Sequence, residues 1–420
     1  MSTDLLASIT ESGERIRRDS DADSEYLFDT PLLVTVCALV GFGLVMLYSA
    51  SVVMASDEFG NSFYLLQSQA LKVGLGVVAM IGATTVHYRW YRRLVYPMLF
   101  GTVVLLGLVL IPGIGVVQNG ARRWFSIAGV SLQPAEIAKV VTVIFLAYSI
   151  SKKGEKMSKF TVGFIPHLLI IGLMVGLLIM QPDFGTSVIL VTMMGIMLFV
   201  SGARLVYLSG FGILGLVGAY YAITSSQYRM ERIMAFLDPW QYRQDIGYQI
   251  SESLIAIGSG GLTGRGLGSG TGKLGYVPEL WNDFIGTLVA EELGLLGMVV
   301  LVGLFVTFVW RGFQIAYEAE DRFGSYLAFG LTTLIGVQAS ANLCVVTGLL
   351  PTKGLTLPFF SLGGSSIIMT LFAAGILLNI SKNEPDWWER NREEREEYRQ
   401  KKRWERKRKR ILKRREDLRG

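Results

Sequence analysis

The sequence contains very few of the residues that build covalent cross-links and metal centres. Its 420 residues include two cysteines and two histidines. Cys37 and Cys344 both lie inside apolar runs, and His87 and His167 are far apart along the chain. A disulfide framework, a zinc site and an iron–sulfur site therefore have no support in the sequence.

Charge is also scarce in the middle of the chain. Lys and Arg total 40 and Asp and Glu total 34, but residues 382–420 alone hold 17 and 10 of these. Hydrophobic residues make up 51% of the sequence and the mean hydropathy is +0.43, which is too apolar for an ordinary soluble domain. A soluble enzyme is therefore disfavoured, and the middle of the chain is predicted to lie in a membrane.

Ten apolar runs are long enough to be membrane-spanning helices, each of which needs about 20 residues. Residues 1–30 are polar and acidic and lack the pattern of a cleaved signal peptide, so the first span is expected to be retained. The predicted fold is an all-α polytopic membrane protein with a large outer loop, residues 225–283, between helices 7 and 8. The ten runs lie near residues 31–54, 68–86, 95–112, 135–151, 163–181, 184–203, 205–224, 284–310, 325–350 and 358–381.

The distribution of positive charge predicts the orientation of these spans. Residues 87–94, 152–160 and 311–324 are basic, whereas residues 55–67 and 181–183 are poor in Lys and Arg. By the positive-inside rule, the basic connections are cytoplasmic. With an even number of spans, both termini are then also cytoplasmic and the large loop lies on the outer face of the membrane.

Composition divides the chain into three parts. Residues 1–30 have many acids and little apolar content, so disorder is expected there. Residues 31–381 form the membrane domain. Residues 382–420 form a basic cytoplasmic tail, whose position directly after a span favours contact with anionic membrane lipid over nucleic acid. A solvated helix with Glu–Arg pairs explains the same composition at least as well.

Glycines are dense in residues 247–283, which invites a phosphate-binding interpretation. The segment does not fit a Walker loop, because Leu267 and Leu274 stand where Gly and Ser or Thr are required. Free backbone amides beside Arg265 and Lys273 could form a nest for a pyrophosphate. Tight turns and close backbone packing explain the glycines without a ligand, and composition alone favours that interpretation.

Several carboxylates in and after this segment are candidates for chemistry. Asp283 directly precedes the apolar run from Phe284, so it is expected to be the N-cap of the eighth span, a role that would explain it without catalysis. Glu291 and Glu292 lie roughly 12–13 Å deeper at 1.5 Å per residue. An ionisable group at that depth indicates either function or a structural ion pair. Asp238 is a further acid of the outer loop.

Charged residues also occupy the shorter outer connections. Arg122 and Arg123 either clamp phosphates or anchor the chain at the membrane interface. Asp183 lies in a very short turn, for which a turn or cap role is sufficient. Glu136 and Lys139 are spaced i, i+3 at the start of the fourth span, and this spacing favours a structural pair.

Seven strings, in order along the chain, carry a family resemblance: NGARRWFSIAGVSLQPAEIAK (119–139), QPDFGTS (181–187), AFLDPW (235–240), GYQISESLIAIGSGGLTGRGLG (247–268), KLGYVPELWNDF (273–284), EELG (291–294) and GLLPTKGLTLPFFSLGGSS (348–366). Together they strongly resemble the SEDS family of bacterial cell-wall polymerases. The resemblance covers nearly all ten spans. AFLDPW and PTKGLTLP are similar to the division and sporulation branches of the family.

The resemblance implies a peptidoglycan glycosyltransferase that polymerises lipid II into undecaprenyl-linked glycan strands on the outer leaflet, during septal cell-wall synthesis. It also implies a class B penicillin-binding transpeptidase and other division proteins as partners. A lipid II flippase and a non-catalytic division scaffold are the alternatives.

The family's essential acid falls on Asp283, as general base or as anchor of a divalent cation, Mg²⁺ or Mn²⁺. Trp281 and Asn282 replace the common His-Thr before it, which bears on how the base is oriented. From the resemblance and the charge pattern together, the residues expected to bind the pyrophosphate or sugar are Arg122, Arg123, Asp238, Arg243, Gln249, Lys273 and Lys353. Those expected to have a supporting role are Glu136, Lys139, Asp183, Glu291 and Glu292. Which cations neutralise the leaving pyrophosphate is left open by the sequence.

Overall fold

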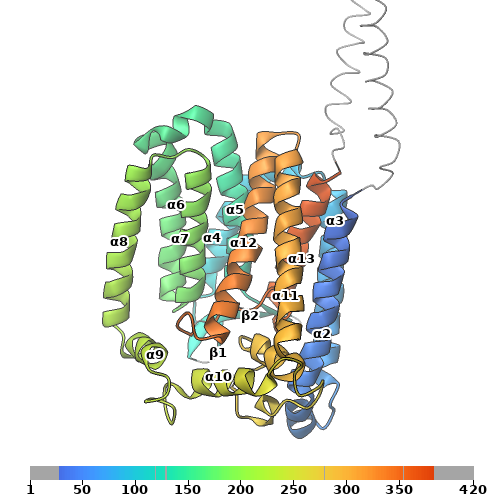
Figure 1. The fold of residues 1–420 in the computed structure, drawn as a ribbon. Helices are drawn as coiled ribbons and strands as arrows, with labels where there is room; N and C mark the ends of the chain where they lie inside the picture. Colours follow the sequence, from blue (N-terminus) through green and yellow to red (C-terminus); the bar gives the residue numbers. More distant parts are fainter. Residues whose placement is uncertain (1–27, 119, 128–129, 279, 353, 383–420) are drawn as a thin grey trace, which may run out of the picture. The chain divides into compact units, whose positions relative to one another are not determined.

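The structure is a computed structural model in which a helical unit ends at Lys382. It describes residues 28–118, 120–127, 130–278, 280–352 and 354–382. The predicted basic tail, most of the predicted N-terminal segment and the candidate Lys353 therefore lie outside the described residues. The helical unit is a bundle with a small sheet at one end (Figure 1).

Each of the ten predicted apolar runs contains a helix. Seven helices or helical segments in the described part of the chain are long and apolar enough to cross a membrane, at α2 to α6, α11 and α12. The helices α7 and α13 and the apolar part of α8 are shorter. The bounds are α2 (Thr30–Phe59), α3 (Tyr64–Thr85), α4 (Arg89–Leu108), α5 (Pro134–Lys153), α6 (Ile165–Met180), α7 (Phe184–Val200), α8 (Leu205–Thr224), α11 (Ile285–Glu318), α12 (Arg322–Val346) and α13 (Gly364–Ile380).

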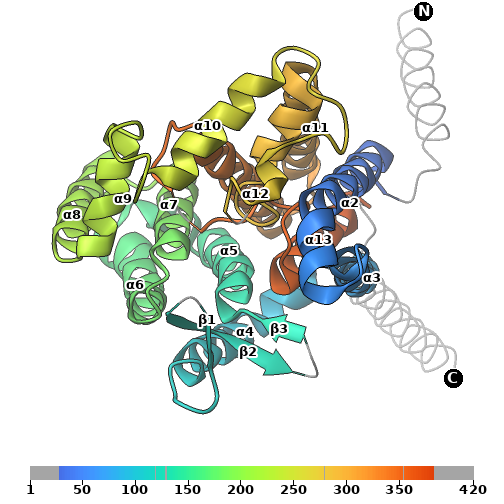
Figure 2. The same cartoon turned by 90° about the horizontal axis from the view of Figure 1, so that it is seen from below.

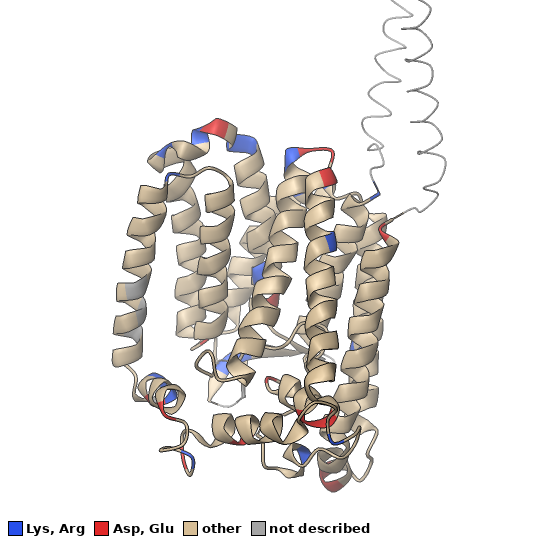
Figure 3. Cartoon of the chain, in the orientation of Figure 1, with Lys and Arg blue, Asp and Glu red and all other residues tan. Residues whose placement is uncertain are grey.

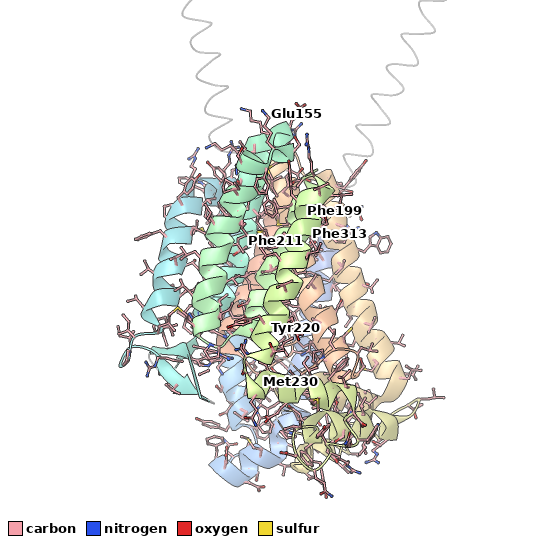
Figure 4. All side chains as sticks on the ribbon, turned by 90° about the vertical axis from the view of Figure 1, so that its left-hand side faces the viewer. Glu155, Phe199, Phe211, Tyr220, Met230 and Phe313 are labelled. Carbon is pink, nitrogen blue, oxygen red and sulfur yellow. The ribbon has the colours of Figure 1, made fainter. Side chains whose placement is uncertain are left out.

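Consecutive spans alternate in direction, so the connections gather at two ends of the bundle (Figure 1). One end, called here the basic end, carries the connection at residues 154–164. The opposite end, called the loop end, carries residues 225–284. The charged residues of the described chain lie mainly at these two ends (Figure 3). Figure 4 shows Glu155 at the basic end and Met230 at the loop end, with Phe211 and Tyr220 between them on α8. This apolar middle zone is the part expected to face lipid.

The two ends of the helical unit meet at the basic end. The backbone amide of Asp29 donates to Ser381 Oγ at 3.0 Å. The Asp29 carboxylate also pairs with Arg311 and accepts from the amide of Leu32 at 2.7 Å, which caps α2. The chain therefore enters and leaves the bundle on one side, as the even number of predicted spans requires.

Small residues allow α3 and α13 to pack closely. A Cβ added to Gly76 would lie 2.6 Å from Leu371 Cδ1, and one added to Gly375 would lie 2.4 Å from the carbonyl oxygen of Met80. Close approach of this kind is characteristic of membrane helices, whose association depends on packing. The pairing fixes which face of α3 points into the bundle.

Residues 116–132 form three short strands that the sequence analysis did not predict. The strands β1 (Val116–Gln118), β2 (Ala121–Ile127) and β3 (Val130–Leu132) pair antiparallel in the order β1-β2-β3. The segment 225–284 also contains two helices, α9 (Gln227–Leu237) and α10 (Tyr248–Gly260). The loop end is therefore built from ordered elements in the described part of the chain.

The helix α11 is interrupted at Gly294, where φ is 66° and ψ is −159°. A break of this kind frees backbone groups that need partners inside a membrane. Four backbone hydrogen bonds supply them from the glycine-rich residues 261–266. They join Leu295 N to Gly261 O and Leu296 N to Leu262 O (3.0 and 3.1 Å), and Arg265 N to Glu291 O and Gly266 N to Glu292 O (3.0 and 2.9 Å).

Candidate active site

The loop end contains a cavity of about 1320 Å³. Its walls come from β2, from α9 and from the loop-end parts of α3, α5, α7 and α13. Figure 2 looks onto this end and shows α9 and α3 on opposite sides of α5. Six residues that the sequence predicted as site residues line the cavity: Arg123, Glu136, Lys139, Asp183, Gln249 and Asp283.

Main-chain hydrogen bonds fix the position of Asp283. The carbonyls of Trp281, Asn282 and Asp283 accept, in order, from the amide of Leu362 (3.1 Å), from Ser361 Oγ (2.7 Å) and from Asn342 Nδ2 (2.8 Å). Both Ser361 and Asn342 are buried. The three donors lie on α12 and on the connection from α12 to α13, so these elements together set where the carboxylate lies.

The expectation that Asp283 caps the eighth span is wrong. The N-cap of α11 is Phe284, and no side chain makes a capping hydrogen bond there. Asp283 lies one residue earlier, where its side chain lines the cavity. A Cβ on Gly354 would lie 3.4 Å from Asp283 Oδ2, so the carboxylate borders the loop before the last span.

The predicted Glu136–Lys139 pair forms and is buried. The ammonium of Lys139 lies 2.8 Å from Glu136 Oε2, and these side chains are 3% and 10% exposed. The pair lies in the first turns of α5, which begins with Pro134. Because both charges line the cavity, the pair gives α5 a polar surface there without adding net charge.

Asp183 is the N-cap of α7, which agrees with the cap role predicted for it. Its Oδ1 accepts from the amide of Thr186 at 3.0 Å, and its Oδ2 accepts from Thr186 Oγ1 at 2.9 Å. Gln133 Nε2 approaches the same carboxylate at 3.4 Å. The carboxylate is thus held by hydrogen bonds at the cavity wall.

The two neighbouring arginines of β2 have different environments. Arg123 donates from Nε to the carbonyl of Gln181 (2.8 Å) and from Nη2 to that of Pro182 (2.5 Å), and it lines the cavity. Arg122 donates to the carbonyl of Leu110 at 3.2 Å and is not a cavity-lining residue. Side chains alternate across a strand, which explains the difference. Arg122 as a phosphate ligand is therefore not supported.

Three other predicted ligands lie away from the cavity lining. Asp238 accepts from the amide of Gln241 at 3.0 Å and is exposed. Arg243 pairs with Glu252 at 2.9 Å. Lys273 pairs with a buried carboxylate at 3.2 Å. In the described structure, each of these three residues contacts another protein group and none of them lines the cavity.

The cavity contains three cations that the sequence analysis did not single out: Lys72 on α3 and Arg229 and Arg232 on α9. Arg229 lies over the ring of Phe184 at 6.0 Å, and Arg232 donates to the carbonyl of Thr352 at 2.9 Å. The i, i+3 spacing of Arg229 and Arg232 on a short amphipathic helix could have identified them from the sequence as candidate phosphate ligands. The cavity-lining cations are Lys72, Arg123, Lys139, Arg229 and Arg232, against the carboxylates of Glu136, Asp183 and Asp283.

Glu291 and Glu292 are fully buried and hold the glycine-rich loop. Glu291 accepts from the amides of Thr271 (2.7 Å) and Gly272 (3.1 Å). Glu292 accepts from the amide of Gly270 at 3.1 Å and pairs with Lys273. The amides that the sequence suggested for a pyrophosphate nest therefore bind the protein's own carboxylates. These contacts agree with two of the earlier interpretations. The glycines allow close backbone packing, and the two glutamates have a structural role in ion pairs.

The donor set for a metal ion is small. Among the described residues, no group of three His, Cys, Asp or Glu side chains could hold a metal ion. Asp283 still offers one hard oxygen ligand on a cavity wall. Mg²⁺ is commonly bound by one or two carboxylates together with substrate phosphates and water. A divalent cation at Asp283 would therefore need substrate phosphates and water as its other ligands.

Comparison with known proteins identifies the family. The FtsW/RodA/SpoVE family model, described as "Cell cycle protein", matches residues 30–386. The chain belongs to this family. Within it, a Geobacter metallireducens protein named "Probable peptidoglycan glycosyltransferase FtsW" is 46% identical over 354 residues, covering 84% of this chain and 94% of that protein. Stage V sporulation protein E of Bacillus subtilis is 41% identical, covering 84% and 97%.

Solved structures of FtsW/RodA/SpoVE proteins have the same fold. A chain from a structure titled "Structural coordination of polymerization and crosslinking by a peptidoglycan synthase complex" matches with a TM-score of 0.72 and 30% identity, over 85% of this chain and 98% of that one. RodA of Thermus thermophilus matches with a TM-score of 0.65 and 28% identity, over 86% and 98%. The family expected from the sequence strings is thereby confirmed.

Proposed function

We propose that Asp283 is the general base with which this protein polymerises lipid II into glycan strands. The protein is a peptidoglycan glycosyltransferase of the FtsW type. The observation that carries the role of Asp283 is its position. It is a carboxylate on a backbone fixed by three hydrogen bonds, at the wall of a cavity with more cations than anions.

In the proposed reaction, the 4-hydroxyl of the acceptor's N-acetylglucosamine attacks C1 of the donor's N-acetylmuramic acid. Asp283 takes the hydroxyl proton as the new C1–O bond forms. The bond from C1 to undecaprenyl pyrophosphate breaks on the opposite side, so the configuration at C1 inverts. A base fixed by the main chain suits this step, since proton transfer requires a hydrogen-bond distance to the hydroxyl.

The leaving pyrophosphate gains negative charge during this step, and fixed cations stabilise such charge. Arg123, Arg229 and Arg232 line the cavity, and these are the cations that we propose stabilise the charge. Of these three, only Arg123 was expected from the sequence; Arg229 and Arg232 were not. A divalent ion bound by Asp283 and the phosphates would supply further positive charge, and Asp283 would then act as an anchor in place of a base.

One assay separates a polymerase from a flippase or a scaffold. Purified protein, with and without a class B transpeptidase partner, is given lipid II in detergent, where movement between leaflets has no meaning. We expect glycan strands with the partner, because the matched structure is that of a peptidoglycan synthase complex, in which polymerization and crosslinking are coordinated. The products are measured by gel electrophoresis of labelled glycan. Intact lipid II after incubation with the folded complex would favour a flippase or scaffold.

We further propose ten membrane spans with the basic end in the cytoplasm and the loop end outside. In a chain lacking Cys37 and Cys344, a cysteine at exposed Ser269 is expected to react with a membrane-impermeant maleimide from outside. A cysteine at Lys156, exposed on the basic end, is the matched control and should react only after the inner membrane is permeabilised. The reverse pattern would contradict the proposed orientation.

A further inference from the structure

Lys72 is an unusual residue for its position. It is the single charged side chain of α3 and lies eight residues after the start of this apolar helix. At 1.5 Å per residue, this is roughly 12 Å along the helix. A charged side chain inside a membrane helix is costly and normally faces a water-filled cavity or the interior of the protein.

The packing of α3 directs Lys72 into the bundle. Lys72 precedes Gly76 by four residues and Met80 by eight, so all three share one face of the helix. Gly76 and Met80 contact α13. A Cβ on Gly364, the first residue of α13, would lie 3.5 Å from Lys72 Cδ and 3.6 Å from its Cε. The aliphatic part of Lys72 therefore lies against the start of α13.

The ammonium group of Lys72 lacks a counterion in the described part of the chain. Lys72 lines the cavity that also contains Asp283, yet no hydrogen bond or ion pair joins it to another described residue. Lys139, another cation of the cavity lining, is already paired with Glu136. A partly buried ammonium without a carboxylate is best stabilised by an anionic ligand.

We infer that Lys72 binds a phosphate of a polyprenyl diphosphate lipid in the cavity. The inference rests on the proposed function, because both substrates of that reaction carry this chemical group. The helix α9, which carries Arg229 and Arg232, and the helix α3 lie on opposite sides of α5 (Figure 2), so Lys72 adds a cation to the cavity from a different wall. The diphosphate belongs either to lipid II or to the growing strand, since each of them is linked to undecaprenyl pyrophosphate.

The first test is direct binding of undecaprenyl pyrophosphate to the purified full-length chain in detergent. Lys72→Met removes the charge and keeps a long side chain against Gly364. We expect it to weaken binding about tenfold, because a charge-assisted hydrogen bond to phosphate is lost. Lys72→Arg should bind within about twofold of the original chain. Binding of neutral undecaprenol should not change in either variant.

Lys156→Met is the matched control, since it removes one positive charge from an exposed position at the basic end. It should bind undecaprenyl pyrophosphate normally. Unchanged binding by folded Lys72→Met, or equal weakening by Lys156→Met, would overturn the inference. Thermal unfolding of each variant distinguishes a lost contact from lost structure, and rescue by arginine would not follow from a purely structural role.

Kinetics then identify the source of the diphosphate. Lipid II and an undecaprenyl-pyrophosphate-linked tetrasaccharide are varied separately. A rise in the KM for lipid II in Lys72→Met, with kcat nearly unchanged, assigns Lys72 to the diphosphate of lipid II. A rise in the KM for the tetrasaccharide assigns it to the diphosphate of the growing strand, and no rise in either contradicts the inference. If the original chain makes no glycan, the proposed function fails, whatever the binding result for Lys72.

Discussion

Replacing Asp283 with asparagine is expected to lower the rate of glycan synthesis by roughly 10²–10⁴-fold, the usual loss when a positioned base is removed. Asparagine has nearly the same volume and cannot accept the hydroxyl proton. The hydrogen bonds that hold this segment involve the carbonyls of residues 281–283, so the substitution leaves them in place. The variant should therefore insert and fold normally. The measurement is polymerisation of lipid II at matched folded concentration.

Asp238→Asn is the matched control, because Asp238 is an exposed carboxylate of the same segment, residues 225–284, and does not line the cavity. Its synthesis should be nearly normal. Near-normal synthesis by Asp283→Asn would exclude Asp283 as the base and leave Glu136 and Asp183 as the cavity-lining carboxylates. Partial recovery with added Mg²⁺ or Mn²⁺ would favour a metal-anchoring role over proton abstraction.

Replacing Glu292 with alanine is expected to destabilise the protein by about 3–5 kcal/mol, the range for breaking a buried ion pair from one side. The carboxylate is fully buried, and the Lys273 side chain that pairs with it is 7% exposed. Ser49 Oγ and the amide of Gly270 would lose their acceptor as well. The effect should appear as a lower melting temperature in detergent and a lower yield of monodisperse protein.

Glu252→Ala provides the comparison, because Glu252 pairs with Arg243 in the same outer segment and the arginine side chain is 51% exposed. Ion pairs at the surface contribute about 0–1 kcal/mol, so this variant should melt close to the original chain. Equal melting temperatures for Glu292→Ala and Glu252→Ala would show that the buried cluster does not stabilise the loop end. Replacing Lys273 with methionine should recover part of the stability lost in Glu292→Ala.

The features that depend on local sequence were predictable. Long apolar runs determine membrane helices, so a helix occurs in every predicted run. Boundaries were less accurate: α4 ends at Leu108, short of residue 112, and α11 continues to Glu318, beyond residue 310. The cap at Asp183 and the pair between Glu136 and Lys139 depend on residues three apart, and the structure contains both.

Features that depend on distant contacts could not be derived in this way. Lys72 reaches the cavity because α3 packs on α13, which is almost 300 residues later in the chain. Asp283 appeared to be a cap, because its sequence neighbours do not reveal that Ser361 and Asn342 hold the turn before α11. Three short strands were missed, since segments of three to seven residues give little periodic signal.

The break in α11 has a consequence for the order in which the protein is assembled. The backbone groups freed at Gly294 are paired by residues 261–266, which are synthesised about 30 residues earlier. At 5–20 residues per second, that segment precedes the broken helix by roughly two to six seconds. The partner segment is thus already made when α11 enters the membrane, and an interrupted helix can insert without an interval in which its open backbone faces lipid alone.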